Sequence, residues 1–193
     1  MRKCLSLLLV LSLLYAPVAY ATSLQYTLPG VPITFADSGQ TPVSGGSLVV
    51  LTLSALGAGA GQYSARYSKG TGAQPSLWQI SCHVQLTGTN TAGQAVEIYV
   101  VRWDPSGVYS DGMVGTTTGS FATDKRRNMK RIGVLAVDQT TTNTTMNATI
   151  DNVYIPGQYF SLAIWNATAL PLKTDATVHG CIATPMPYQA QNT

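Results

Sequence analysis

Two cysteines and two histidines occur as close pairs, and these residue types often carry chemistry. Cys82 directly precedes His83, and His179 lies two positions before Cys181. On a strand, His179 and Cys181 would face the same side, whereas Cys82 and His83 would face opposite sides. The pattern therefore brings at most three ligands together, fewer than a tetrahedral zinc site needs. A cysteine–histidine nucleophile pair and a structural disulfide are the alternatives.

No residue pattern typical of catalysis is present. The chain has neither a glycine-rich phosphate loop followed by Lys nor a Gly-x-Ser-x-Gly sequence. Its eight acidic residues are scattered, and most lie in turn-like segments that favour Asp. Asp104, Asp111 and Asp124 could meet in one excursion and hold Ca²⁺, but this ion prefers roughly six to eight oxygen ligands and no calcium-loop motif occurs. We expect no enzymatic activity, no metal and no cofactor.

Basic residues are concentrated in one short segment. They could contact an acidic partner surface or a phosphate, or they could form a solvated loop or a rim neutralised by ion pairs. Nucleic-acid binding is not expected, because the interleaved aromatic residues and the wide basic face typical of it are missing. We call these five residues the interaction rim: Lys125, Arg126, Arg127, Lys130 and Arg131.

Three Asn-x-Thr sequences resemble acceptor sites for N-linked glycans. They begin at Asn143, Asn147 and Asn166. In a Thr-rich chain such triplets also arise by chance, which is the interpretation that we favour. Asn166 directly follows an apolar pair and is expected to be partly buried.

The N-terminus has the parts of an export signal in the expected order. Arg2 and Lys3 are followed by an apolar stretch. The small-x-small sequence Ala19-Tyr20-Ala21 then marks an expected cleavage site after Ala21. The stretch is too short to cross a bilayer as a helix, so no stable membrane span is expected after leader removal. The chain thus divides into a signal peptide or hydrophobic N-terminal arm, residues 1–21, expected to be helical, and one domain, residues 22–193.

Export would favour the disulfide among the alternatives for the cysteines. Cys4 leaves with the leader, so the domain keeps an even pair, Cys82 and Cys181. A bridge between them would close a loop of roughly 100 residues and stabilise the fold by about 4 to 5 kcal/mol, according to the chain-entropy relation. We predict the disulfide Cys82–Cys181.

The composition favours strands over helices. Charged residues make up 10% of the chain, against roughly 25% in a typical soluble domain, and Glu97 is the only glutamate. Long surface helices need Lys and Glu on their solvated faces. The polar surface must instead consist of Thr, Ser, Gln, Asn and Gly, which suit strands and turns.

Many short strand-like segments separated by Gly and Pro turns predict an all-β sandwich or barrel of about eight or nine strands. Pro32 is expected to confine the first strand to a sheet edge. Tyr63 and Tyr67 alternate in period two and should share one face. A single helical turn capped by Thr123 or Asp124 is the only helix expected in the domain. The predicted strands are 31–35, 47–54, 62–68, 77–87, 95–103, 131–137, 144–151, 158–165 and 176–184.

Several stretches spread over most of the domain share a common style. They are 31–39, 51–67, 93–99, 128–133, 165–168 and 184–187. In these stretches the chain resembles small proteins encoded beside the capsid genes of tailed bacteriophages, which look like head decoration or accessory virion proteins. The resemblance implies a single β-sandwich of jelly-roll type without a cofactor. It also implies a homo-oligomer whose partners are the major capsid protein or other virion proteins.

Two functions are compatible with the sequence. The resemblance implies a non-enzymatic structural virion protein that decorates or stabilises the capsid surface of a tailed phage. The leader does not fit this expectation, because tailed phages assemble in the cytoplasm. The leader and the cysteine pair instead favour a secreted or periplasmic β-sandwich binding or adhesion module, with glycans among its candidate ligands. The expected location is the virion or, for the second function, the periplasm or the extracellular space.

Overall fold

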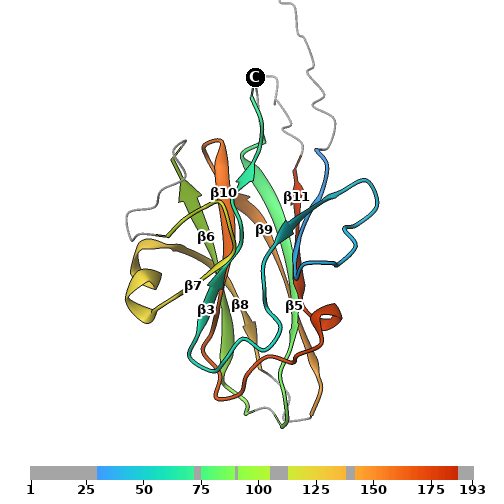
Figure 1. The fold of residues 1–193 in the computed structure, drawn as a ribbon, viewed down its shortest axis with the longest axis vertical. Helices are drawn as coiled ribbons and strands as arrows, with labels where there is room; N and C mark the ends of the chain where they lie inside the picture. Colours follow the sequence, from blue (N-terminus) through green and yellow to red (C-terminus); the bar gives the residue numbers. More distant parts are fainter. Residues whose placement is uncertain (1–29, 72–74, 90, 105–112, 138–141, 187–193) are drawn as a thin grey trace, which may run out of the picture. The chain divides into compact units, whose positions relative to one another are not determined.

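Two β-sheets packed face to face make up the part of the chain that the computed structural model describes (Figure 1). This part comprises residues 30–71, 75–89, 91–104, 113–137 and 142–186. The predicted leader lies outside it, so its structure stays a prediction. The predicted all-β sandwich is confirmed, since nearly all regular structure in the described residues is strand.

The first sheet contains five strands in the order β2-β1-β11-β5-β9. Neighbouring strands are antiparallel except for β1 and β2, which are parallel. The strands of this sheet are β1 (Ile33–Ala36), β2 (Ser47–Val50), β5 (Leu77–Gln85), β9 (Thr145–Tyr154) and β11 (Gly180–Pro185).

The second sheet has six strands, and each pair of neighbouring strands in it is antiparallel. Five of them follow the order β7-β3-β10-β6-β8, and β4 pairs with β10 beside β3. The strands of this sheet are β3 (Gly61–Tyr63), β4 (Tyr67–Ser68), β6 (Ala95–Trp103), β7 (Gly119–Phe121), β8 (Lys130–Ala136) and β10 (Tyr159–Asn166).

The central strands of the second sheet, β6 and β10, are buried on both faces. Along β6, Val96 belongs to the core between the sheets, whereas Tyr99 and Trp103 belong to a second apolar cluster on the outer face. Successive side chains of a strand point to opposite faces, which places the two sets apart. Phe121 and Met129 complete the outer cluster. Burial on both faces explains why the sequence of β6 is almost continuously apolar.

Several strands lie where the sequence predicts them. The segments 77–87, 95–103, 131–137 and 158–165 correspond to β5, β6, β8 and β10. The predicted strand 47–54 ends early, at Val50, and the one at 176–184 begins only at Gly180, because a short 3₁₀ helix, η2 (Ala176–Val178), precedes it. Strand β7 is not among the predicted strands, since its three residues carry no recognisable periodicity.

Two predictions about the early strands are wrong. Strand β1 is not at an edge, because it pairs with β11 on one side and with β2 on the other. Pro32 lies just before the strand, where its missing N–H removes no ladder bond, and its carbonyl accepts from the Ser47 N–H at 3.2 Å. Tyr63 and Tyr67 do not share a face, because Tyr63 joins the outer cluster and Tyr67 packs against the inner core. The irregular residues between β3 and β4 interrupt the alternation.

The predicted helical turn exists as the 3₁₀ helix η1 (Thr123–Asn128), but its cap differs. The N-cap residue is Ala122, which offers no side-chain hydrogen bond, so neither Thr123 nor Asp124 caps the turn. Among the described residues, no helix has the length and apolar character needed to cross a membrane.

Candidate functional site

The two cysteines form a disulfide across the first sheet. Cys82 of β5 and Cys181 of β11 are directly opposed in the antiparallel register, with their Cα atoms 4.0 Å apart. Both side chains are almost fully buried within the core between the sheets. The predicted disulfide is confirmed. Because the bridge uses both sulfur atoms, neither thiol serves as a zinc ligand or as a nucleophile.

His179 is a buried structural residue. Its Nδ1 accepts from the Gln85 N–H at 3.3 Å, which leaves Nε2 as the protonated nitrogen. That nitrogen donates to the Lys173 carbonyl at 2.9 Å, so both ring nitrogens are satisfied in the neutral form. Burial lowers the pKa of His179. Burial also lowers the pKa of the neighbouring His83, and the charge of His179 contributes in the same direction.

The proposed calcium ligands are not shown to converge. Asp104 and Asp124 are exposed, and Asp111 lies outside the described residues. No three His, Cys, Asp or Glu side chains in the described part of the chain are grouped as a metal site.

The interaction rim divides into two kinds of residue around Glu97. Arg126 binds the Glu97 carboxylate at 2.7 Å and Arg131 binds it at 3.3 Å. The Arg126 guanidinium also lies over the Trp165 ring, 4.3 Å from its centroid. Arg126 therefore anchors η1 to the outer face of the second sheet. This half of the rim matches the ion-paired alternative.

Tyr99 completes this network. Its hydroxyl donates to Glu97 Oε2 at 2.5 Å. Burial and the hydrogen bond to Glu97 raise the pKa of Tyr99 to about 12. Although burial opposes ionisation of Glu97, the hydrogen bonds from Tyr99 and the guanidinium groups hold its pKa below the usual range. At neutral pH the Glu97 carboxylate is therefore ionised and the Tyr99 hydroxyl keeps its proton.

The remaining rim residues make no ion pair with Glu97. Lys125 is half-buried, Arg127 and Lys130 are exposed, and the Lys130 ammonium lies 3.5 Å from the Tyr154 carbonyl. Arg102, which the sequence argument overlooked, lines the same hollow as Lys130. It was missed because it lies near the end of β6, far from the rim in sequence. The structure therefore extends the exposed positive surface beyond the predicted segment.

The predicted burial of Asn166 proves complete, and its role is structural. Its side-chain NH₂ donates to the carbonyls of Leu56, Gly57 and Leu170 at 2.8 to 3.3 Å. Its Oδ1 accepts from the backbone N–H and the hydroxyl of Thr168. The amide is therefore not available as a glycan acceptor. Asn143 and Asn147 are exposed.

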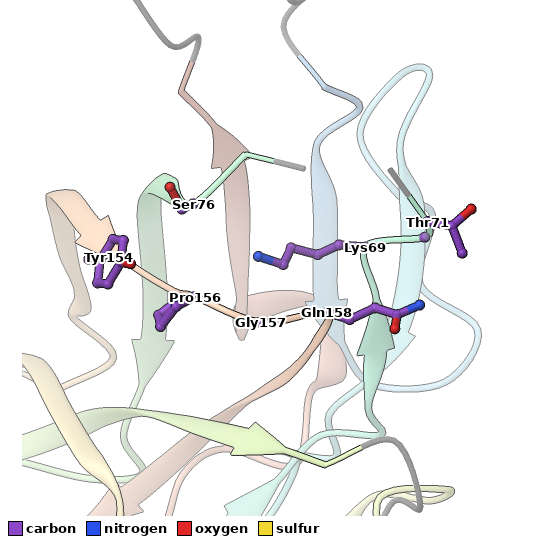
Figure 2. Close-up of a pocket in the computed structure, with 8 residues that line it drawn as sticks. Lys69, Thr71, Ser76, Tyr154, Pro156, Gly157 and Gln158 are labelled. Carbon is purple, nitrogen blue, oxygen red and sulfur yellow. The ribbon is translucent and has the colours of Figure 1, made fainter. Parts of the chain in front are cut away.

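A pocket of about 520 Å³ opens where three chain connections meet, and the sequence argument did not identify it (Figure 2). Lys69, only 8% exposed, extends across it. The Lys69 ammonium donates to the carbonyls of Ile155 at 2.8 Å and Pro75 at 3.2 Å. Burial lowers its pKa. In the sequence, Lys69 is merely the first residue of a Lys-Gly turn, so no signal marked it.

Comparison with known proteins finds no match to any family model or to any curated protein. The site must therefore be interpreted from its own geometry.

Proposed function

We propose that this chain is a non-enzymatic structural protein of jelly-roll type that decorates the capsid surface of a tailed phage. The strand order carries the proposal. The four strands β1-β11-β5-β9 face the four strands β3-β10-β6-β8, so most spatial neighbours are distant in sequence. This order is the one expected of two interleaved Greek keys, an architecture that recurs in viral capsid and lectin domains.

The buried polar groups support a structural role. Asp37 accepts from the Leu53 and Ser54 backbone N–H groups and from the Ser54 hydroxyl. His179 and Asn166 are likewise committed to backbone groups of this chain. Catalysis instead needs polar groups that converge on a space where substrate can lie. In these residues the hydrogen-bonding capacity is used to hold loops in place.

Three exposed basic residues form the surface that would contact a partner. Arg127 and Lys130 belong to the interaction rim, and Arg102 lines the same hollow as Lys130. Such a surface fits an acidic face of the major capsid protein or of another virion protein, with the rim repeated in each copy of a homo-oligomer. Arg126 and Arg131 would keep the rim in shape through Glu97.

The disulfide favours a second candidate function, an exported binding or adhesion module. Buried bridges such as Cys82–Cys181 form in oxidising compartments and are rare in the cytosol. A periplasmic or extracellular location would agree with the predicted leader, residues 1–21.

Mass spectrometry of purified particles and of cell-free medium separates the two candidates. The virion proposal expects tryptic peptides of this chain in particles that survive density-gradient purification, at a fixed ratio to the major capsid protein. Its recovery only from medium or periplasm, beginning at Thr22, would refute the virion proposal and support export. The N-terminal peptide in each fraction reports whether the leader is removed.

A charge-reversal experiment tests the rim. Arg127→Glu combined with Lys130→Glu should slow association with particles stripped of this protein by about tenfold or more and reduce its salt dependence. Lys173→Glu, which lies outside the rim, is the control. Unchanged association of the double variant would show that the rim is not the contact surface.

A further inference from the structure

The pocket around Lys69 is built from three connections at one end of the sandwich. Lys69 follows β4, Ser76 precedes β5, and Tyr154, Gly157 and Gln158 lie at or after the end of β9. In Figure 2 the Lys69 side chain reaches across the space toward the segments that carry Ser76 and Tyr154. These residues are far apart in sequence, so only the fold brings them together.

Main-chain hydrogen bonds join the connections that line this pocket. The Lys69 N–H donates to the Gln158 carbonyl at 2.9 Å, and the Ile155 N–H donates to the Ser76 carbonyl at 2.7 Å. The three connections are therefore joined by main-chain hydrogen bonds. The Lys69 ammonium adds hydrogen bonds to the Pro75 and Ile155 carbonyls.

Among the residues that the structure describes, the Lys69 ammonium has fewer acceptors than donors. It has three N–H donors, and the described acceptors are two carbonyl oxygens, those of Pro75 and Ile155. Neither ion pair in the described part of the chain includes Lys69, because both belong to Glu97. A buried cation beside neutral acceptors alone is costly, and an incoming carboxylate would offset that cost. The remaining N–H is the natural point of attachment for an anion.

The rest of the lining suits a sugar ring. Ser76 contributes a hydroxyl group on the side toward which the Lys69 ammonium extends, and Tyr154, which is 54% exposed, offers an aromatic face there, whereas the Thr71 and Gln158 side chains extend the other way (Figure 2). A hydroxyl group matches the donors and acceptors of a saccharide, and a tyrosine ring packs against its C–H face. Phosphate is a poorer fit, because the lining holds a single ammonium and no guanidinium fork or helix N-terminus.

We propose that this pocket binds an acidic saccharide, with the sugar carboxylate on Lys69 Nζ and the ring against Tyr154. None of its lining residues belongs to the interaction rim, although the Tyr154 carbonyl contacts the Lys130 ammonium at 3.5 Å. The proposed saccharide binding is compatible with a virion protein and with an exported module. A glycan-binding end would give either protein a means of attachment to an acidic polysaccharide surface.

The test is a titration of the ¹⁵N-labelled full chain at pH 7, monitored by the NMR chemical shifts of its backbone amides. Glucuronate and N-acetylneuraminate are the acidic probes, and glucose and inorganic phosphate are the controls. We expect an acidic sugar to shift the amides around Lys69, Ser76 and Gln158 with a Kd on the order of 1 mM, as for other small ligands of this size. Glucose should bind at least about tenfold more weakly, because it lacks the carboxylate.

Two variants assign the contacts. Lys69→Met should weaken glucuronate binding by about tenfold or more, and Tyr154→Ala should weaken it severalfold without affecting folding, because that ring is exposed. Lys173→Met, outside the pocket, should bind like the parent protein. If Lys69→Met fails to fold, Tyr154→Ala and Ser76→Ala decide the question.

Four results would overturn the proposal. They are the absence of shifts around the pocket with either acidic sugar, equal affinity for glucose and glucuronate, a response to phosphate matching that to glucuronate, and unaltered glucuronate affinity in the pocket variants. The experiment uses isolated protein, so its outcome is independent of whether the chain is found in particles.

Discussion

Removal of the Cys82–Cys181 bridge should cost this domain a large share of its stability. The two cysteines are 99 positions apart, so the bridge closes a very long loop in the unfolded chain. For a loop of roughly 100 residues, the chain-entropy relation gives a stabilisation of about 4 to 5 kcal/mol at 25 °C. Small domains are stable by only about 5 to 15 kcal/mol, so the reduced form should approach the limit of folding.

The assay is urea unfolding of the oxidised protein, the reduced protein and the double variant Cys82→Ala, Cys181→Ala. Reduction keeps both sulfur atoms in the core, where Cys82 is 3% exposed and Cys181 0%. Its effect therefore isolates the lost cross-link. The double variant loses the same cross-link and, in addition, packing around two buried sulfur positions. We expect it to be the least stable of the three.

A difference of less than about 1 kcal/mol between the oxidised and reduced proteins would refute the loop-entropy argument for this bridge. Alkylation of both thiols in native protein without reductant would refute the bridge itself. Mass spectrometry after labelling in denaturant, with and without reduction, distinguishes these two outcomes.

Three further predictions concern single residues. Asn166→Ala should lower the free energy of unfolding by about 2 to 4 kcal/mol in urea titrations, because it leaves several buried carbonyls without donors; a loss below about 1 kcal/mol would contradict this role. Gly61→Val should cost about 1 to 3 kcal/mol because the Phe121 ring lies directly on Gly61, whereas the control Gly57→Ala has open space and should cost much less. The low pKa of His179 in the folded state implies that stability is complete above the ordinary histidine pKa of about 6.5 and declines as the pH falls below it. A urea midpoint that is equal at about pH 7.5 and about pH 5 would exclude this linkage.

Much of the fold could be predicted because strand periodicity is a local property. The residues of β6, Ala95–Trp103, form an almost continuous apolar run rich in β-branched and aromatic types, so the prediction at 95–103 has the same bounds as the strand. The low content of charged residues excluded long surface helices for a similarly direct reason. Predictions from local patterns were wrong where the pairing of strands decided the position of a strand in its sheet. The parallel partner β2 beyond β1 removes that strand from the edge, although Pro32 precedes it.

The candidate sites depended more strongly on tertiary structure. Residue spacing identified the rim segment, yet Arg126 and Arg127 are adjacent in sequence and differ in role. The Arg126 guanidinium pairs with Glu97 of β6 and stacks on Trp165 of β10, whereas Arg127 remains exposed. Lys69 had no sequence signal, because its burial and its two carbonyl acceptors come from connections distant along the chain.

The sequence by itself determined the strand-rich composition, the even cysteine pair and the positions of most strands, because each follows from residue type and short-range spacing. It also determined the hydrophobic N-terminal segment, residues 1–21, that predicts an export signal. Only the tertiary structure decided that the cysteines meet across β5 and β11, that β6 and β10 are buried on both faces, and that a buried lysine lines a pocket. These features require contacts between distant segments, and such contacts are set by sheet order, which local propensity does not encode.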